Sequence, residues 1–312
     1  DKRKMVRYLN LIREIYIQYH EVIERKGKFG ILDPIGTFQE RGEVPTEAAK
    51  GAKALKEKIG TLIQHVRETH DIKGVAIATA GIVDEEAGRI VYALPSTWPG
   101  YSGTNWKNFI ETNFHLPVIV ENDTNAAALG ELTFGAAKDT EDFFMLTIGT
   151  SIGGALVLNK KIVHGAAKCA GEIALMHVPE GTLHECASAS ALLRSAENEK
   201  HLAKNSLDGR AFFSLLEKGN PLAENAVKKY ADALAGGISN IASVLNPPLF
   251  VLGGGIMAKG AHIRPYLLQS LKKRLLPIVF NHTHIAFAVC GNDAGLLGAA
   301  SLMFRQFGQM KC

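Results

Sequence analysis

Cysteine is scarce in this 312-residue sequence, and long apolar segments are absent. The four cysteines, Cys169, Cys186, Cys290 and Cys312, are widely spaced, and no Cys-x-x-Cys pair occurs. This spacing argues against a zinc cluster made of cysteines alone and favours the reduced thiols of a cytoplasmic protein. No run of about 18 apolar residues is present, so we expect no membrane-spanning helix. The basic N-terminal segment mixes charges into its apolar stretch, unlike a secretory signal.

Positive charge is in excess only at the start of the chain. The whole sequence has 35 basic and 31 acidic side chains, a net charge of +4, and residues 1–28 alone hold eight basic and four acidic ones. The remainder is therefore neutral, and a neutral body binds nucleic acid poorly because phosphate neutralisation supplies most of that affinity. Hydrophobic residues make up 46% and charged residues 21%, which is typical of a soluble globular enzyme. We expect no nucleic-acid partner.

The first segment has a helical spacing of apolar residues. They recur at steps of three and four between Met5 and Ile23. This period predicts an amphipathic helix that packs on the rest of the protein or on a partner subunit. A basic arm that binds nucleic acid or a membrane is the alternative.

Beyond Lys28, strands and helices alternate. Residues 29–44 read as a hairpin, and apolar strands near 75–78, 118–120, 143–148 and 249–252 each run into a polar or glycine-rich turn. Helices are expected near 47–70, 105–114, 123–134, 221–245, 260–275 and 293–304. This order predicts two α/β domains with a cleft between them. We place the first domain at 1–122 plus 293–312 and the second at 123–292.

Two glycine-rich turns could approach a phosphate or a flat ring. One is Ile148-Gly149-Thr150-Ser151-Ile152-Gly153-Gly154-Ala155, between two strand-like runs, and the other is Gly253-Gly254-Gly255, between a strand and a helix. Glycine permits close backbone approach, so N–H groups can bind phosphate oxygens. An ordinary glycine-rich hairpin and a tight strand-to-helix turn are the alternatives.

Carboxylates provide the candidate catalytic group. Glu121-Asn122-Asp123-Thr124-Asn125 follows a buried strand and opens a helix. Asn and Asp are good helix caps, but a carboxylate at this end of a strand can also take a proton from a substrate hydroxyl. Glu172 and Glu185 follow turn-like stretches and could accept hydrogen bonds from a sugar, although each is more often a surface residue.

Histidines give little support for a metal site. His177, His184 and Cys186 lack an obvious fourth ligand, and His282 and His284 are only two residues apart. Tetrahedral zinc usually needs a fuller set of ligands. We therefore expect no zinc.

Together, these motifs resemble the ROK family of repressors, open reading frames and sugar kinases. The resemblance extends over about 28–304 and rests on the order and spacing of 121–125, 146–155, 170–173, 251–255 and 292–299, together with Gly165 and Glu185. It implies the two-domain, actin-like ATPase fold of hexokinases, with an interdomain cleft. It also implies transfer of a phosphoryl group from ATP, with Mg²⁺, to a sugar hydroxyl. Family members are commonly dimers, so a homodimer is expected.

The resemblance assigns roles residue by residue. Asp123 matches the general base, and Asn122, Glu172 and Glu185 match sugar-binding positions. Gly81 matches a loop on the sugar side, and Asn105 is expected to contact the sugar as well. The nucleotide-side positions are Gly149, Thr150, Ser151 and Gly153 in the phosphate loop, with Gly254 and Gly255 near the adenosine.

Departures from the family pattern are also present. The Asp-x-Gly-Gly-Thr phosphate loop expected just before Lys28 is missing, since Gly27 is the only glycine in 9–27. Leu175 stands where many members have a histidine, the cysteine cluster is absent, and Ser151 replaces the last glycine of Gly-Thr-Gly. Because it lacks this histidine and the cysteine cluster, the sequence resembles the zinc-free branch of the family, which includes β-glucoside kinases and some N-acetylmannosamine kinases.

Two functions therefore remain open. The first is a cytoplasmic sugar kinase that acts on a hexose, an N-acetylhexosamine or a β-glucoside. The second is a sugar-binding sensor or regulator without kinase activity, or a kinase whose sequence is disrupted upstream of Lys28. Only 27 residues precede the resemblance, too few for the winged helix of the family's repressors, so a DNA-binding repressor is not expected.

Overall fold

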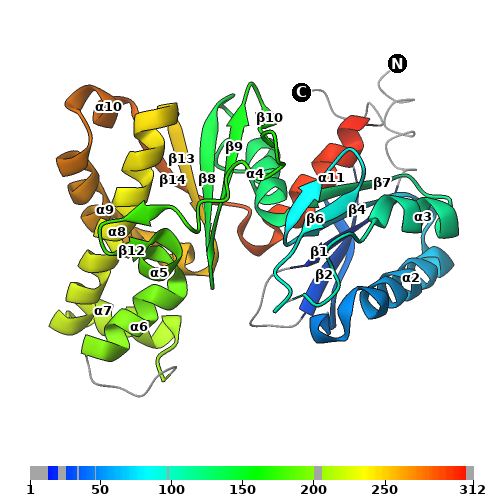
Figure 1. The fold of residues 1–312 in the computed structure, drawn as a ribbon, viewed down its shortest axis with the longest axis horizontal. Helices are drawn as coiled ribbons and strands as arrows, with labels where there is room; N and C mark the ends of the chain where they lie inside the picture. Colours follow the sequence, from blue (N-terminus) through cyan, green and yellow to red (C-terminus); the bar gives the residue numbers. More distant parts are fainter. Residues whose placement is uncertain are drawn as a thin grey trace. The chain divides into compact units, whose positions relative to one another are not determined.

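The computed structural model describes residues 13–19, 26–33, 35–45, 47–96, 98–199 and 206–306 (Figure 1). These residues form two compact units. The first contains the described residues up to Lys138, the segment His164–Ala170 and the residues from Asp293 onward, and the second contains Asp139–Val163 and Gly171–Asn292. The predicted mixed α/β fold is confirmed. The first unit extends beyond the domain boundary that we placed at residue 122.

The first unit is built on a five-stranded sheet in the order β3-β2-β1-β4-β7. Its strands are β1 (Arg13–Tyr19), β2 (Lys26–Leu32), β3 (Phe38–Pro45), β4 (Ile72–Thr79) and β7 (Val118–Asn122), and β5 (Ile82–Asp84) pairs with β6 (Arg89–Tyr92) in a separate ribbon. Strands β1, β4 and β7 are parallel, and Tyr19, Thr79 and Asn122 lie in register. The carboxyl ends of three strands therefore meet at one edge.

Helices cover both faces of this sheet. They are α2 (Gly51–Thr69), α3 (Trp106–Phe114), α4 (Asp123–Phe134) and α11 (Ala294–Gln306), with the short 3-10 turn η1 (Ala48–Lys50). A second 3-10 turn, η3 (Gly291–Asp293), lies where the chain passes from the second unit back to the first. Apolar side chains of α2 and α3 share one core with Ile77 and Val120 of the sheet. On the other face, α11 packs closely on α4, where a Cβ at Gly298 would collide with the Ala126 carbonyl (Figure 1).

The helix predicted from Met5 to Ile23 is wrong where the structure describes it. Residues 13–19 form β1, which pairs antiparallel with β2 and parallel with β4, and the rest of the predicted helix lies outside the described residues. Isoleucine and tyrosine dominate this segment and favour extended structure. A position between two strands satisfies the backbone on both sides, and this pairing outweighs the helical spacing.

The second unit has its own five-stranded sheet, in the order β10-β9-β8-β13-β14. The strands are β8 (Phe143–Ile148), β9 (Ile152–Leu158), β10 (Lys161–Ile162), β13 (Leu249–Gly253) and β14 (His284–Phe287), and β11 (His177–Val178) pairs with β12 (Gly181–Thr182). Strand β13 runs parallel to β8, with Gly253 opposite Thr147. Two glycine-rich turns therefore follow neighbouring strand ends.

The second unit has a set of helices, most of which pack on the long helix α8. They are α5 (Leu183–Ala187), α6 (Ala189–Glu199), α7 (Gly209–Glu217), α8 (Pro221–Leu245), α9 (Gly260–Arg274) and α10 (Pro277–His282), with the 3-10 turn η2 (Gly255–Lys259). Helix α8 has the predicted bounds because Asn220 caps its first turn and left-handed Asn246 ends it. Its apolar face joins β8 and β13 in a core separate from that of the first unit. Across the described ranges, no helix is both long and apolar enough to span a membrane.

Candidate active site

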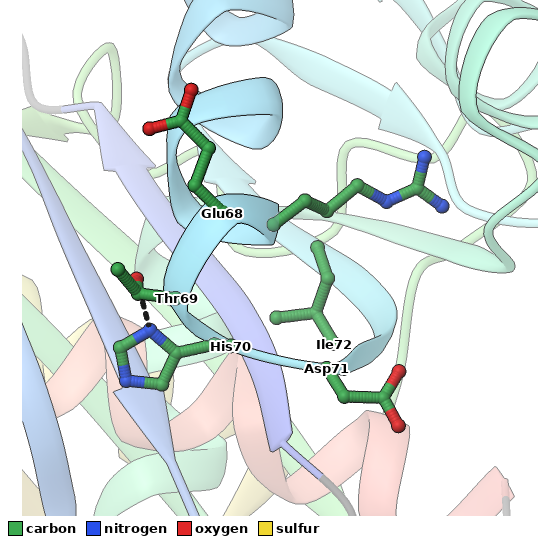
Figure 2. A pocket seen from close by; sticks show the side chains of 6 residues that line it. Glu68, Thr69, His70, Asp71 and Ile72 are labelled. Atoms are coloured by element: carbon green, nitrogen blue, oxygen red, sulfur yellow. Dashed lines mark hydrogen bonds between the residues drawn. The ribbon is translucent and has the colours of Figure 1, made fainter.

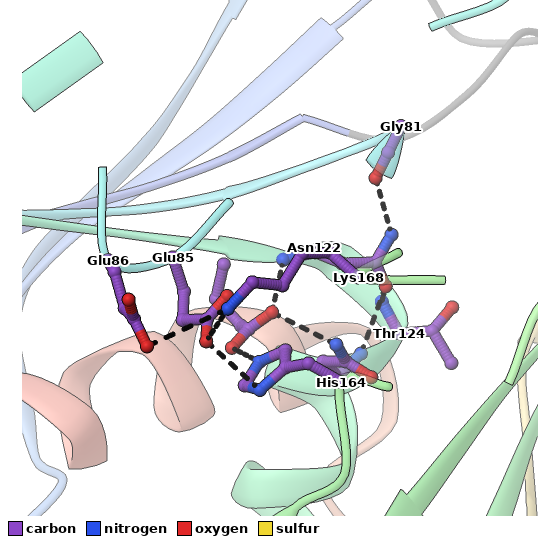
Figure 3. Close-up of polar contacts among 9 residues, drawn as sticks. Gly81, Glu85, Glu86, Asn122, Thr124, His164 and Lys168 are labelled. Atoms are coloured by element: carbon purple, nitrogen blue, oxygen red, sulfur yellow. Dashed lines mark hydrogen bonds and ion pairs between the residues drawn. The ribbon is translucent and has the colours of Figure 1, made fainter. Parts of the chain in front are cut away.

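The transition from β7 to α4 places Asn122 and Asp123 at the strand edge of the first unit. Asn122 caps α4: its Oδ1 accepts hydrogen bonds from the N–H groups of Thr124 (2.9 Å) and Asn125 (3.1 Å). Its Nδ2 donates to the Gly81 carbonyl at 3.0 Å, which ties the end of β7 to the turn after β4 (Figure 3). The structure thus brings the predicted residues Gly81, Asn122 and Asp123 together.

Asp123 is the first residue of α4 and is partly buried. Desolvation raises the pKa of its carboxyl to about 6, although Oδ1 accepts a hydrogen bond from the Thr124 N–H at 2.9 Å. A carboxylate with a pKa just below neutrality is ionised at pH 7 and still basic enough to take a proton from a bound hydroxyl. Its position and its pKa both suit a general base.

A buried hydrogen-bond network fixes the end of β4 beside this carboxylate. The Tyr101 hydroxyl lies 2.7 Å from Thr79 Oγ1 and accepts a hydrogen bond from Trp106 Nε1 at 3.0 Å. Burial raises the pKa of Tyr101 to about 12, and the negative charge of Asp123 contributes to the shift. Gly81 follows with φ +99°, and a Cβ there would lie 2.7 Å from the Tyr92 carbonyl oxygen. Only glycine fits this turn without strain.

Beside Asn122 lies a cluster of titratable side chains that the sequence did not predict, formed by Glu121, Glu85, His164 and Lys168. Glu121 is 2% exposed and accepts hydrogen bonds at Oε1 from the Asn122 N–H (2.8 Å) and from Asn125 Nδ2 (3.0 Å). Its Oε2 lies 2.8 Å from His164 Nε2. The other imidazole nitrogen lies 3.3 Å from Glu85 Oε1, and Lys168 Nζ donates to the same oxygen at 2.8 Å (Figure 3). The only sequence signal was the position of His164 beside Gly165.

In the second unit, the two predicted glycine turns lie side by side. Gly149 N–H donates to the Ser151 carbonyl at 2.9 Å, and the Gly149 carbonyl accepts from the Ala189 N–H at 2.9 Å. Gly254, with φ +99°, packs so closely on Ile148 that a Cβ would collide with its backbone. Thr150 and Gly153 belong to the same β8–β9 hairpin. The carboxyl edge of this sheet therefore exposes glycine backbone from both turns.

The two kinds of glycine have different explanations. Gly254 is required by its positive φ and by contact with Ile148. In contrast, a Cβ at Gly149 or Gly255 would meet no atom within 4 Å, and neither residue has a positive φ. The chain itself would accept alanine at both positions. Their glycines are explained if a ligand approaches the backbone, as a phosphate or a nucleoside would.

Of the other three predicted substrate residues, two cap helices and one is exposed to solvent. Asn105 caps α3 by accepting a hydrogen bond from the Asn108 N–H at 2.8 Å. Glu185 forms a capping box with Thr182, whose backbone and hydroxyl hydrogen bonds lower the pKa of the carboxyl. Its neighbour His184 instead faces the glycine turn, with Nδ1 2.9 Å from Ser151 Oγ. Glu172 is exposed beside Gly171. Their sugar contacts stay predictions.

Other possible sites are weaker. In the described part of the chain, no group of three or more His, Cys, Asp or Glu residues is arranged to hold a metal ion. A pocket lies around the end of α2 and the start of β4, lined by Arg67, Glu68, Thr69, His70, Asp71 and Ile72 (Figure 2). At a rise of about 3.3 Å per residue, Ile72 is about 23 Å from Thr79. This pocket is therefore at the opposite end of the strand from Asp123.

Comparisons with known proteins agree with this fold. The ROK family model matches residues 24–306. The chain is 44% identical over 272 residues to an uncharacterised protein of Clostridium perfringens, which covers 87% of this chain and 92% of that protein. It is 29% identical over 311 residues to a glucokinase of Halalkalibacterium halodurans, with 91% and 93% covered.

A solved structure shows the same fold. The ROK family glucokinase from Streptomyces griseus, in complex with glucose and AMPPNP, superposes with a TM-score of 0.78 at 26% identity, covering 93% of this chain and 98% of that one. The fold is thus the actin-like ATPase fold of ROK sugar kinases. The chain belongs to the ROK family.

Proposed function

We propose that this protein is a sugar kinase that transfers the γ-phosphoryl group of MgATP to a hydroxyl of a hexose, an N-acetylhexosamine or a β-glucoside. The observation that carries the proposal is Asp123, a partly buried carboxylate with a pKa of about 6 at the strand edge of the first unit. The similarity to two glucokinases supports it.

In the proposed reaction, Asp123 accepts the proton of the attacking hydroxyl. The sugar oxygen then forms a bond to the γ-phosphorus, and the bond between that phosphorus and the bridging oxygen of ADP breaks. Asn122 is already oriented by its hydrogen bond to the Gly81 carbonyl, at 3.0 Å, so it can hold a neighbouring sugar hydroxyl. Such positioning supplies much of the catalysis in phosphoryl transfer, where little covalent chemistry is required of the protein.

MgATP is proposed to bind as substrate at the second unit. The open backbone at Gly149 and Gly255 suits phosphate oxygens and adenosine, and the Thr150 and Ser151 hydroxyls can donate to phosphate. The magnesium ion arrives with the nucleotide and neutralises charge on the β- and γ-phosphates.

The direct test is ADP release from MgATP against a sugar panel: glucose, mannose, N-acetylmannosamine, N-acetylglucosamine, fructose and cellobiose. We expect turnover with at least one sugar and a loss of about 100-fold or more in Asp123→Asn, because general-base catalysis contributes about 10²- to 10⁴-fold. The control is sugar-induced thermal stabilisation, which Asp123→Asn should retain. Turnover that persists in Asp123→Asn would show that Asp123 is not the base.

A second candidate is a sugar-binding ROK protein that does not phosphorylate its ligand. It is favoured by one observation: β1 ends at the edge where a first phosphate loop would follow, and the sequence around it has no Asp-x-Gly-Gly-Thr. This function would be established, and the kinase refuted, if a sugar stabilised the protein against heat while no sugar of the panel caused release of ADP from MgATP.

A further inference from the structure

The segment His164–Ala170 does not belong to the same unit as its neighbours in sequence. The chain before it and after it belongs to the second unit, but these seven residues cluster with the first. Two of its side chains, His164 and Lys168, contact the carboxylates of Glu121 and Glu85 in the cluster beside Asn122 (Figure 3). The segment is thus attached to the first unit close to the proposed base.

His164 lies between two carboxylates. Its Nε2 is 2.8 Å from Glu121 Oε2, and its Nδ1 is 3.3 Å from Glu85 Oε1. A neutral imidazole has one nitrogen without a proton, which would direct a lone pair at a carboxylate. Only the imidazolium can donate to both oxygens. This geometry points to a charged His164.

Other charges around His164 agree with this state. Burial alone lowers the pKa of His164, but the Glu121 and Glu85 carboxylates outweigh burial and the nearby Lys168 charge, so the pKa is raised. Glu121 is on β7, Glu85 is in the β5–β6 turn, and Lys168 is four residues along the same segment.

Glu121 connects His164 to the turn that carries Asn122 and Asp123. One carboxylate oxygen faces the imidazole, and the other accepts hydrogen bonds from the Asn122 N–H (2.8 Å) and Asn125 Nδ2 (3.0 Å). These two residues flank Asp123 in sequence. If Glu121 loses its partner, its buried charge must find another one, and the hydrogen bonds that orient the turn will change.

We propose that His164, as an imidazolium, is a positioning residue that holds Glu121 and thereby fixes the turn carrying Asn122 and Asp123. The proposal rests on the kinase function above and adds to it a residue that touches neither sugar nor nucleotide. It also makes that turn depend on the proton of His164, because neutral His164 cannot hold both carboxylates.

The test compares kcat and KM as functions of pH in four proteins: wild type, His164→Gln, Lys168→Met and His65→Gln. His65 is the matched control, since it also faces a carboxylate, Glu68 at 3.4 Å, but both side chains are about 70% exposed on α2. Lys168→Met removes a positive charge near His164 without touching Glu121, and the variant protects the test against a His164→Gln protein that does not fold.

Each protein has a distinct expected result. Wild-type kcat falls at high pH as His164 loses its proton. His164→Gln lowers kcat by about 10- to 100-fold with a smaller change in sugar KM, because misplacement of a catalytic group by about 1 Å costs up to 100-fold, and it lacks the high-pH fall. Lys168 lowers the pKa of His164, so Lys168→Met moves the high-pH fall to higher pH. His65→Gln matches wild type.

Several results would overturn the proposal. One is a kcat for His164→Gln within twofold of wild type, and another is a high-pH fall that Lys168→Met leaves in place. A loss of activity equal to the loss of folded protein, with an unchanged pH profile, would show a structural role only.

If the wild-type protein transfers no phosphate to any sugar, the kinase function is refuted, but the positioning role of His164 can still be tested. Hydrogen exchange of the Asn122 amide is then compared with that of the Ile119 amide in the same strand. Protection of Asn122 that is lost as His164 deprotonates supports the positioning role. Equal behaviour of the two amides across that pH range overturns it.

Discussion

Asp123 makes the folded state less stable at neutral pH because burial removes water from its carboxylate. Its pKa is about 6 in the folded chain against an ordinary 3.8, so between these pH values the folded chain binds more protons than the unfolded chain. The free energy of unfolding therefore falls as pH rises from about 4 to about 6 and stays lower above. The same burial that lowers stability also makes the Asp123 carboxylate more basic.

We therefore expect Asp123→Asn to be more stable than wild type at pH 8, by about 1–3 kcal/mol, since an amide has no charge to desolvate. At pH 3 the two proteins should differ little, because a carboxyl with the ordinary pKa of 3.8 is then largely protonated in the unfolded chain as well as in the folded one. Urea unfolding at the two pH values measures the difference. Equal stabilities at pH 8 would mean that Asp123 is well solvated, which would also weaken its assignment as the base.

At the level of single elements, the sequence predicted six of the ten described α-helices, but it predicted neither strand β1 nor the helices α5, α6, α7 and α10. Helix α8 and strand β8 have the expected bounds, because a cap, a proline and a glycine-rich turn mark their ends locally. Strand β1 has no such mark. Its partners, β2 and β4, determine its structure, and no local pattern contains that information.

The glycine turns allow a prediction with a built-in comparison. Gly149→Ala should leave the melting temperature unchanged, since its Cβ meets no atom within 4 Å, but should raise the KM for MgATP because the methyl group lies where a phosphate would approach. Gly254→Ala should instead destabilise the fold by more than about 1 kcal/mol, since alanine is strained at φ +99° and collides with Ile148.

Thermal unfolding and ATP titration of both variants separate the two roles. If Gly149→Ala lowers the melting temperature as much as Gly254→Ala does, the turn is structural and the argument for a ligand at Gly149 fails.

For the molecule as a whole, the strand edges of the site were predictable and the charged cluster was not. Asn122 and Asp123 follow a buried strand directly, so sequence order places them. His164 contacts Glu121 across 43 residues, and Lys168 contacts Glu85 across 83. Such contacts depend on the packed chain. The same holds for Glu185: a shift of one residue turns a side chain by about 100° around a helix, so His184 rather than Glu185 faces Ser151.

Two separate cores predict that the units unfold independently. Ile59 is in the core of the first unit and Ile263 in that of the second, and both are fully buried. Replacing either by alanine should cost about 2–5 kcal/mol, which lowers the melting temperature of that unit by roughly 5–15 °C. Both tryptophans of the chain, Trp98 and Trp106, lie in the first unit, so their fluorescence reports that unit alone.

We therefore expect Ile59→Ala to shift the fluorescence transition, and Ile263→Ala to shift only part of the circular dichroism transition and leave fluorescence unchanged. Ile278→Ala is the control, because its side chain is 69% exposed and its loss should change neither signal. A fluorescence transition that moves equally in Ile59→Ala and Ile263→Ala would show that the units unfold as one. The two units would then unfold in one cooperative transition, and a substitution in either core would lower the stability of the turn that carries Asp123.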